Sequence, residues 1–302
     1  EADIYKIFLN LKGILDDFLY PSTLLDMVCC KGALTCNLGL CNSPGLSEEV
    51  EKMIKERFVG TIAFGKLGIK INGCPNACGH HPLGLIAFHG IVRRVSGRPV
   101  PFYRLLLGGR KALEKTRLAK DTGILLPAKN VPLFLKDFIG AIDKELSENT
   151  DIYDYIEERG ETLARESAAP YSGVPDYSQD KNFYIDWGRT EEFSLEGLGP
   201  GECGRGVLDM IDADLSDAKI SLEKAQRNDY SIQEIKRALF FIAMALLVVR
   251  GLDPKDEQKA LTGFIEKFIK EGIAPLRFSD LKDVYESLDE RLDIKAREKG
   301  FL

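Results

Sequence analysis

The sequence lacks the features that would place the protein on nucleic acid or across a membrane. Its 302 residues carry a formal net charge of −6, and no basic tract stands out that could follow a phosphate backbone. The most apolar run, from Ala238 to Val249, is too short to span a bilayer and has charged residues on both sides. We therefore expect neither a nucleic-acid partner nor a membrane anchor.

Common catalytic patterns are missing as well. The sequence holds only three histidines and shows no Ser-His-Asp arrangement and no paired-carboxylate site. A Gly-rich stretch at 197–206 could bind an anion at a helix N-terminus, but it lacks the Gly-Lys-Ser/Thr ending of a P-loop. We interpret it as a flexible entry loop. Carboxylate-rich segments such as 289–299 are interpreted as solvated helix faces.

The sequence also shows neither a secretory signal at its first residues nor the regular cysteine spacing of a disulfide framework. The first residues, Glu1 to Ile4, are acidic and lack a basic n-region, and the seven cysteines follow no regular spacing. Cysteines that bind a metal cofactor need a reducing compartment, so we expect the cytoplasm. Because the chain does not begin with Met, we interpret it as a processed chain or a part of something longer.

Two short-range cysteine pairs carry the strongest chemical pattern. Cys30 and Cys36 form a C-x5-C, and Cys74 and Cys78 form a C-x3-C within Asn-Gly-Cys-Pro-Asn-Ala-Cys-Gly. Four thiolates in two pairs can hold a [4Fe–4S] cluster, in which each iron takes one cysteine sulfur. Nearby glycines permit tight loops whose N–H groups stabilise negative charge. A zinc site and buried free thiols are the alternatives, although C-x5-C fits zinc knuckles poorly.

The second cysteine loop resembles the cluster loop of the siroheme-dependent sulfite and nitrite reductases. In that family a C-x5-C comes first and a G-C-P-N-x-C-G follows several tens of residues later, which is the order found here. The family's tyrosine strand that ends in Gly-Gly is similar to 103–109, and Thr-Arg-Leu at 116–118 and the Pro-containing segment 126–128 also fit. One departure lies at 85–88, where Leu-Ile-Ala-Phe replaces a segment that usually contains an acidic residue. The resemblance covers roughly residues 25–148.

The resemblance implies a set of cofactor-binding residues but no catalytic residue. The implied ligands of a [4Fe–4S] cluster are Cys30, Cys36, Cys74 and Cys78. Cys78 would also bridge the cluster to a siroheme iron, and Asn76 would shape the loop. Siroheme carries eight carboxylates and needs cationic partners. Arg104 and Arg110 are the first candidates, with a solvated strand edge as the alternative, and three further candidates lie nearby: Arg93, Arg94 and Arg98.

The resemblance also implies that this chain is incomplete as an enzyme. Family members consist of two similar halves, and the chain resembles the second, cluster-bearing half. Many basic groups that hold siroheme and the anion come from the first half, which the segment before Cys30 is too short to supply. We expect the isolated chain to be inactive and to need an N-terminal half or a partner subunit. The implied substrate is sulfite or nitrite, and the implied electron donor is a ferredoxin or a flavoprotein.

A non-catalytic alternative remains open. The chain could be an iron–sulfur electron-transfer or interaction module that lacks siroheme, with its helical domain as a partner-binding surface. The choice between the two functions does not depend on the remaining histidines and cysteines, which receive structural interpretations. His80 and His81 are interpreted as loop residues that cap backbone groups, with a proton-donating contact to siroheme as the alternative. We expect the other four to be structural: His89 in a strand, and Cys29, Cys41 and Cys203 as small buried residues.

Periodicity and turn residues divide the chain into four segments. We predict a leading helix within 1–22, an α/β (α+β) nitrite/sulfite reductase hemoprotein-like half-domain at 23–150, a linker at 151–202 and an all-α helical bundle at 203–302. The linker begins as a Glu-rich, helix-like run, and its aromatic residues suggest that it packs on a domain surface.

The same patterns predict individual elements. In the first half of the chain we predict helices at 3–19, 47–58 and 131–146, with Ser47 as the N-cap of the second. Strands are predicted at 61–64, 68–71, 85–95 and 100–107. In the last segment we predict helices near 206–228, 231–250, 255–271 and 279–299.

Overall fold

The computed structural model describes residues 2–15, 21–112, 115–195, 205–227, 231–254 and 256–288. The chain falls into two units. The first consists of Glu1–Ile91 and Pro101–Glu192, and the second consists of Val92–Val100 and Phe193–Leu302. A single β-hairpin therefore begins in the first unit, turns in the second and returns to the first.

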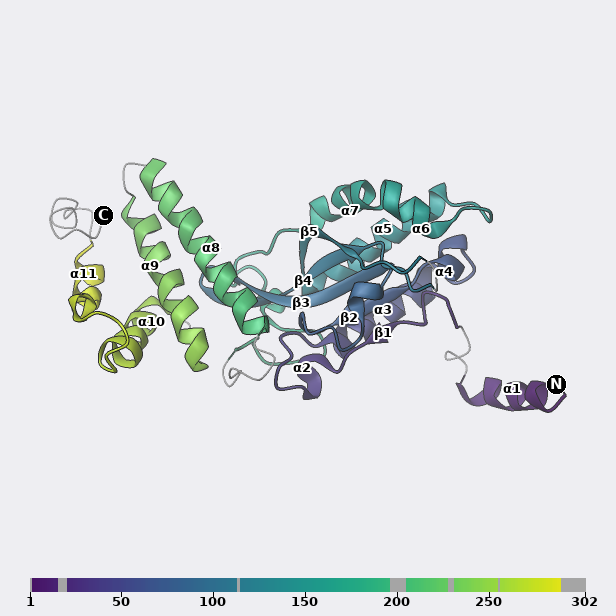
Figure 1. Ribbon diagram of the computed structural model, residues 1–302, viewed down its shortest axis with the longest axis horizontal. Helices are drawn as coiled ribbons and strands as arrows, with labels where there is room; N and C mark the ends of the chain where they lie inside the picture. Colours follow the sequence, from purple (N-terminus) through teal and green to yellow (C-terminus); the bar gives the residue numbers. More distant parts are fainter. Residues whose placement is uncertain are drawn as a thin grey trace. The chain divides into compact units, whose positions relative to one another are not determined.

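A five-stranded mixed sheet is the centre of the first unit (Figure 1). The strands lie in sequence order: β1 (Val28–Cys29), β2 (Ile69–Asn72), β3 (Ile86–Val95), β4 (Arg98–Leu107) and β5 (Lys120–Pro127). The pairs β1–β2 and β2–β3 are parallel, whereas β4 and β5 are antiparallel. Most residues of β3 are buried, as expected for a strand that is covered on both faces.

Helices complete the core of the first unit. Helix α5 (Val131–Glu145) contacts α3 (Ser43–Arg57) and α7 (Glu161–Ala168). Phe134 of α5 meets Phe88 of β3 edge-to-face, with 6.4 Å between ring centroids, which fixes this helix on the sheet. Three shorter helices are α2 (Gly32–Thr35), α4 (Ile62–Lys66) and α6 (Ile152–Tyr155). The predicted helix at 131–146 is confirmed, and so are the predicted strands at 68–71, 85–95 and 100–107.

Two local predictions in this unit are wrong. The helix expected at 47–58 begins at Ser43, because Asn42 is the N-cap: its Oδ1 accepts a hydrogen bond from Gly45 N at 3.4 Å, and Pro44 occupies the first turn. The strand expected at 61–64 is helix α4. Its N-cap is Thr61, whose Oγ1 accepts from Phe64 N at 3.2 Å, so a capped helical turn forms where a short apolar run had suggested a strand.

Residues 151–192 belong to the same unit as the sheet. The Glu-rich run is helical, as predicted: α6 continues through a π-helical turn at Ile156–Gly160 into α7. The aromatic segment that follows packs on the unit, as expected. Trp187 Nε1 donates to Ala128 O at 2.7 Å, and the ammonium of Lys129 lies 4.0 Å from the Trp187 ring centroid.

The described part of the second unit contains the hairpin turn and helices. The helices are α8 (Arg205–Arg227), α9 (Ile232–Leu247), α10 (Glu257–Phe264) with a π-helical continuation at Ile265–Ile269, and α11 (Leu281–Ser287). Their shared core includes Met244, Leu247 and Leu261, each fully buried. The helices predicted near 206–228, 231–250 and 255–271 are confirmed, and that predicted at 279–299 is seen at 281–287. Their arrangement as a bundle stays a prediction, and residues 289–299 lie outside the described residues.

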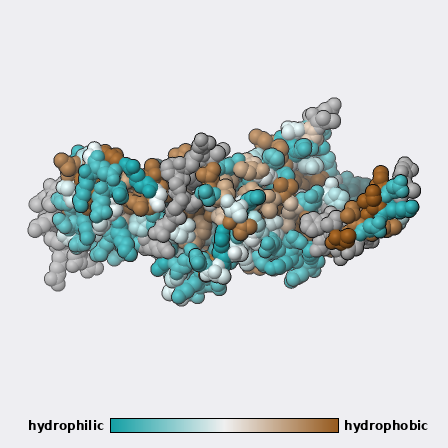
Figure 2. Space-filling view, turned by 90° about the horizontal axis from the view of Figure 1, so that it is seen from below, coloured by the Kyte–Doolittle hydropathy of each residue, from teal (hydrophilic) through white to brown (hydrophobic). Residues whose placement is uncertain are grey.

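The leading helix is confirmed as α1 (Ala2–Leu15), and residues 16–20 lie outside the described residues. The large apolar side chains from Ile4 to Leu11 and Ile14 are exposed, with Ile4 at 72% and Ile14 at 78%, and Figure 2 shows a hydrophobic stripe on this helix. None of the described helices is both long and apolar enough to cross a membrane.

Candidate functional site

The two cysteine pairs are delivered by the carboxyl ends of neighbouring parallel strands. Cys30 directly follows β1, and Cys74 follows β2 after Gly73. The backbone N–H of Cys30 donates to Ile71 O at 3.1 Å, which continues the β1–β2 pairing up to the first ligand candidate. Since parallel strands end at the same sheet edge, both loops start there. Cys36 lies at the end of α2, and Cys78 lies in the loop after β2.

The sulfur of Cys30 is surrounded by hydrogen-bond donors. It accepts from the backbone N–H of Gly32 at 3.3 Å and of Gly73 at 3.1 Å, and it lies 3.2 Å from Ser43 Oγ. The Ser43 hydroxyl also donates to Cys30 O at 2.9 Å. N–H dipoles directed at a sulfur stabilise negative charge there, which is the electrostatic environment that an iron–sulfur ligand needs.

The two loops interlock so closely that only glycine fits between them. A Cβ on Gly73 would lie 2.3 Å from Cys41 O and 2.7 Å from Gly32 Cα. Gly73 O in turn accepts hydrogen bonds from Leu40 N and Cys41 N, at 3.1 and 2.9 Å. The backbone of one cysteine loop is therefore a rigid support for the other.

The second loop is held by the buried amide of Asn72. In the amide orientation that satisfies this loop, its oxygen accepts from Cys78 N and Gly79 N, each at 3.0 Å. Two non-glycine residues of the loop have left-handed backbones, Ala77 with φ of 61° and His80 with φ of 54°. Such conformations cost energy and persist where the surroundings fix them, as Asn72 does here.

The pKa of the Cys74 thiol depends on the other three candidate ligands. Burial raises the pKa of the Cys74 thiol, whereas a hydrogen bond from the Asn76 backbone N–H lowers it. The thiols of Cys30, Cys78 and Cys36 raise this pKa further by charge repulsion, in that order. The structure thus brings the other three cysteines within electrostatic reach of Cys74.

Among the described residues, no three His, Cys, Asp or Glu side chains lie close enough together to hold one metal ion. In a [4Fe–4S] cluster each sulfur binds a different iron, so the sulfurs need not converge on one point.

The candidate siroheme partners fall into two groups. Arg104 and Arg110 belong to the first unit: Arg104 Nη1 pairs with Asp121 at 2.7 Å, and Arg110 lies 4.5 Å from the Tyr153 ring centroid. The other three, which the structure places in the second unit with the hairpin turn, are Arg93, Arg94 and Arg98. Arg93 and Arg94 are ion-paired there with aspartates of that unit.

The histidines differ from the sequence interpretation in one respect. His80 is exposed and precedes a 3-10 turn, but its side chain makes no capping hydrogen bond. His81 and His89 are both buried, and their ring centroids lie 4.9 Å apart. His89 lies in β3, as predicted, so the turn after Cys78 packs on the sheet through this pair. The contact joins residues distant in sequence, and no local pattern indicated it.

The remaining cysteines have contrasting environments. Cys41 is fully buried, as expected, and donates weakly to Ile91 O and Phe102 O at 3.5 Å each. Burial raises the pKa of the Cys41 thiol well above its usual value. The expectation that Cys29 is buried is wrong: it lies on the two-residue edge strand β1, both of whose residues are exposed. Cys203 lies outside the described residues.

Comparison with known proteins gives partial matches. No family model matches the chain. The chain is similar to sulfite reductase [NADPH] hemoprotein beta-components: 24% identical over 148 residues in Bacillus licheniformis, and 30% over 112 residues in Geobacillus kaustophilus. A third, from Pectobacterium carotovorum, is 32% identical over 114 residues. The aligned parts cover 48%, 36% and 36% of this chain. They span only 24%, 18% and 18% of those relatives, about a quarter or less of their length.

One solved structure, of the Mycobacterium tuberculosis NirA protein, matches 48% of this chain and 27% of that chain. The identity is 20% and the TM-score is 0.42, which is too distant a likeness to carry an argument.

Proposed function

We propose that the first unit is the cluster-bearing part of a siroheme- and [4Fe–4S]-dependent reductase of sulfite or nitrite. The observation that carries this proposal is the meeting of two cysteine loops at one sheet edge, around N–H donors that point at Cys30 Sγ. The similarity of 48% of the chain to a sulfite reductase hemoprotein supports it. In this proposal the mixed sheet with its helices is one half-domain of the family, and the helices of the second unit are a bundle added to it.

The residues present fit a four-iron cluster. Cys36 and Cys78 are exposed, Cys30 is half-buried and Cys74 is buried, so the candidate ligands line a surface that a cofactor can reach. When bound, the cluster would supply electrons one at a time, and siroheme would bind the central atom of the anion. Cys78 would be the bridge between the two cofactors. No residue of this chain is assigned as a proton donor.

In this proposal, the residues of the chain position the cluster-binding cysteines and neutralise the carboxylates of siroheme. Asn72 holds the backbone beside Cys78 through two hydrogen bonds, which fixes where that sulfur can lie. Asn76 donates its backbone N–H to Cys74 and so shapes the loop. Arg104 and Arg110 would bind carboxylates of siroheme. The ion pair of Arg104 with Asp121 is solvent-exposed and therefore weak enough to be exchanged for such a partner.

The proposal includes partners that this chain does not contain. An N-terminal half or a partner subunit would supply further cationic groups, because the aligned part spans only 18–24% of its curated relatives. A ferredoxin or a flavoprotein would deliver electrons, and a reducing compartment such as the cytoplasm would keep the cysteines reduced. The chain alone would then lack reductase activity.

The test is an anaerobic reconstitution of the full chain with iron, sulfide and siroheme, followed by absorption and EPR spectroscopy. We expect a broad iron–sulfur band together with tetrapyrrole bands, and magnetic coupling between the two centres if Cys78 bridges them. Absence of any cluster would refute the assignment of the four cysteines.

A second candidate is an iron–sulfur electron-transfer or interaction module without siroheme. It is favoured by one observation: Arg93 and Arg94, two of the candidate siroheme partners, are already paired with Asp217 and Asp214. A cluster spectrum without siroheme uptake, even after a separately expressed N-terminal half of a sulfite reductase is added, would select this module. Uptake after that addition would select the reductase.

A further inference from the structure

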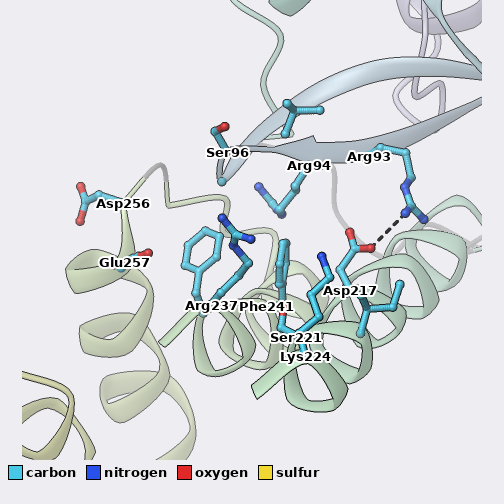
Figure 3. Close-up of a pocket in the computed structure, with 14 residues that line it drawn as sticks. Arg93, Arg94, Ser96, Asp217, Ser221, Lys224, Arg237, Phe241, Asp256 and Glu257 are labelled. Atoms are coloured by element: carbon cyan, nitrogen blue, oxygen red, sulfur yellow. Dashed lines mark hydrogen bonds and ion pairs between the residues drawn. The ribbon is translucent and has the colours of Figure 1, made fainter. Parts of the chain in front are cut away.

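The second unit contains a cavity that the proposed reductase function does not use. Its volume is about 730 Å³, and it lies between the hairpin turn at Ser96–Gly97 and helices α8 and α9 (Figure 3). A cavity of this size falls within the range of small-molecule sites, roughly 300–1,000 Å³. All the residues that line it belong to the second unit.

The acidic residues that line this cavity are committed to other partners. Asp217 pairs with Arg93 at 3.0 Å. Asp256 caps α10 by accepting from Lys259 N at 2.8 Å and pairs with the ammonium of the same lysine at 3.0 Å. Glu257 accepts a hydrogen bond from the Tyr285 hydroxyl. Two of these charges are balanced by cations, Asp217 by Arg93 of the lining and Asp256 by Lys259 outside it, and the lining carries four cationic side chains against three acidic ones.

The cationic residues are less completely paired. Lys224 forms no ion pair with any described residue, and Arg237 has only an exposed contact with Glu234 at 3.5 Å. Figure 3 shows both side chains directed toward the hairpin turn, on either side of Phe241. The charge of Lys224 also acts on Asp217 across the cavity, where it opposes the rise that burial causes in the Asp217 pKa. Two cations that lack a close buried partner and line one cavity are expected to attract an anion.

Arg94 adds a buried donor to the same lining. Its side chain is only 2% exposed and is held by Asp214 through Nε at 3.2 Å and by Asp253 through Nη2 at 2.7 Å. The third nitrogen, Nη1, is buried and has no hydrogen-bond partner among the described residues. A buried guanidinium N–H without an acceptor is costly, and an anion that entered the cavity could satisfy it.

The walls are formed by aromatic residues and a strained turn. Phe240 and Phe241 are buried at 3% and 7% exposure, and the hairpin turn carries Ser96 in a left-handed conformation with φ of 49°. A Cβ added to Gly97 would lie 3.5 Å from the Phe240 ring, in ordinary van der Waals contact with it. This turn and the aromatic pair fix the shape of the cavity, which favours a defined ligand over loosely held ions.

We propose that this cavity binds a phosphate-bearing small molecule through its phosphate group. Lys224 and Arg237 contact the phosphate oxygens, and Arg94, which also lines the cavity, offers its unpartnered Nη1 as a third donor. Phosphate presents several acceptor oxygens and up to two negative charges, which matches three convergent cationic donors better than a single carboxylate does. The cavity holds many times the roughly 30 Å³ of one water, so an organic group attached to the phosphate also fits beside Phe241.

Isothermal titration of the full chain with pyrophosphate, ADP and adenosine tests this proposal. We expect both phosphate compounds to bind at low salt with Kd on the order of 10–100 μM and adenosine not to bind. Equal affinity for pyrophosphate and ADP identifies recognition of phosphate alone, and tighter binding of ADP adds a contact from the organic group. The double variant Lys224→Gln/Arg237→Gln is expected to weaken binding at least about tenfold.

The matched control removes the same charge from the same region. Lys219 and Arg227 are exposed on α8 and do not line the cavity, so Lys219→Gln/Arg227→Gln should leave Kd within about twofold of the parent. All four side chains are exposed, so neither variant should change the thermal melting midpoint appreciably. The proposal is overturned if no phosphate compound binds, if the control weakens binding as much as the test variant, or if adenosine binds as well as ADP.

Discussion

Two polar regions of this protein have opposite chemistry. In the cysteine loops of the first unit, Cys30 receives two N–H donors, while Cys36 and Cys78 are exposed and have no such donors among the described residues. In the second unit, Arg94 lies between Asp214 and Asp253, a set that we call the Arg94 triad. The cysteine loops keep unused bonding capacity at exposed sulfurs, whereas the triad is buried and is held together by two ion pairs, with Arg94 Nη1 and Asp214 Oδ2 left without a hydrogen-bond partner among the described residues. Unused capacity at the surface is open to a large cofactor, whereas the buried ion pairs mainly stabilise the fold.

The triad also shows how burial acts on charge. Two carboxylates share one guanidinium away from water, so the fully ionised triad carries one excess negative charge. Burial raises the pKa of Asp214 to about 6, and Arg94 opposes that rise. Burial likewise raises the pKa of the Cys74 thiol, but the charged groups near this thiol are other cysteines rather than a cation. A positively charged metal cofactor would supply to the thiols what Arg94 supplies to the aspartates.

The largest effect is expected when a candidate cluster ligand in the cysteine loops is removed. Cys30→Ser should abolish stable cluster incorporation, because one iron loses its thiolate ligand. Iron and sulfide analysis after anaerobic reconstitution should fall from about four of each per chain to near background. Cys29→Ser is the matched control: this neighbouring thiol is exposed and is not a predicted ligand. Equal loss in both variants would contradict the assignment of Cys30.

The next effect breaks the triad. Arg94→Met leaves two buried carboxylates without a cation, which should lower the free energy of unfolding by about 3–5 kcal/mol. Arg93→Met is the comparison, because its ion pair with Asp217 is 29% and 16% exposed and should cost about 1 kcal/mol or less. Urea denaturation followed by helical circular dichroism measures both. Similar losses for the two arginines would show that the triad has no special structural weight.

A third prediction concerns pH. In the folded protein Asp214 binds a proton up to about pH 6, whereas in the unfolded chain it has lost that proton above about pH 4. The stability that protonation contributes is therefore complete below about pH 4 and is lost as pH rises through about 6, by up to about 3 kcal/mol. Asp214→Asn should remove this slope. The measurement is the urea midpoint of the parent and of the variant at several pH values between 4 and 7. We expect the difference between the two midpoints to shrink as the pH falls toward 4. If the two midpoints change with pH in parallel, the prediction is contradicted.

The smallest effect tests how closely the cysteine loops are packed. Gly73→Ala introduces a Cβ 2.3 Å from Cys41 O, so we expect a loss of about 1–3 kcal/mol from overpacking. Gly140→Ala, in helix α5 with no heavy atom within 4 Å of the new Cβ, should stabilise by about 0.5–1 kcal/mol instead. Thermal melts of the two variants measure the contrast. A neutral Gly73→Ala would mean that the two loops can separate at little cost.

Local patterns predicted more of the fold than of the site. Strand β2 leading into Cys74 and helix α5 were predicted because their periodicity and boundaries are local in sequence. The segment 61–64 was misread because a short apolar run does not distinguish a strand from a capped helical turn. Ser47 was wrongly predicted as the N-cap for a related reason. The true N-cap, Asn42, directly follows Cys41, so the start of the helix was interpreted as a turn after the cysteine loop.

Contacts between distant residues could not be predicted. Ser43 beside Cys30, and His81 against His89, depend on how loops fold back onto the sheet. Arg94 was considered as a siroheme partner because it follows the cysteine loops in sequence. Its aspartate Asp253 lies 159 residues away, and neither helix propensity nor charge pattern indicates that pairing. Residues 197–204 lie outside the described residues, so the interpretation of that Gly-rich stretch stays a prediction.

The hairpin of β3 and β4 limits how this protein could be divided. The chain crosses between its two units at 91–92, at 100–101 and again at 192–193. A gene cut at the last crossing alone would yield a sheet unit whose Arg94 had lost both aspartates, and a helical unit whose aspartates had lost their arginine. The two parts therefore do not behave as interchangeable modules. If evolution added or removed the helices of the second unit, the residues at the tip of the β3–β4 hairpin would have had to change as well, about a hundred residues earlier in the chain.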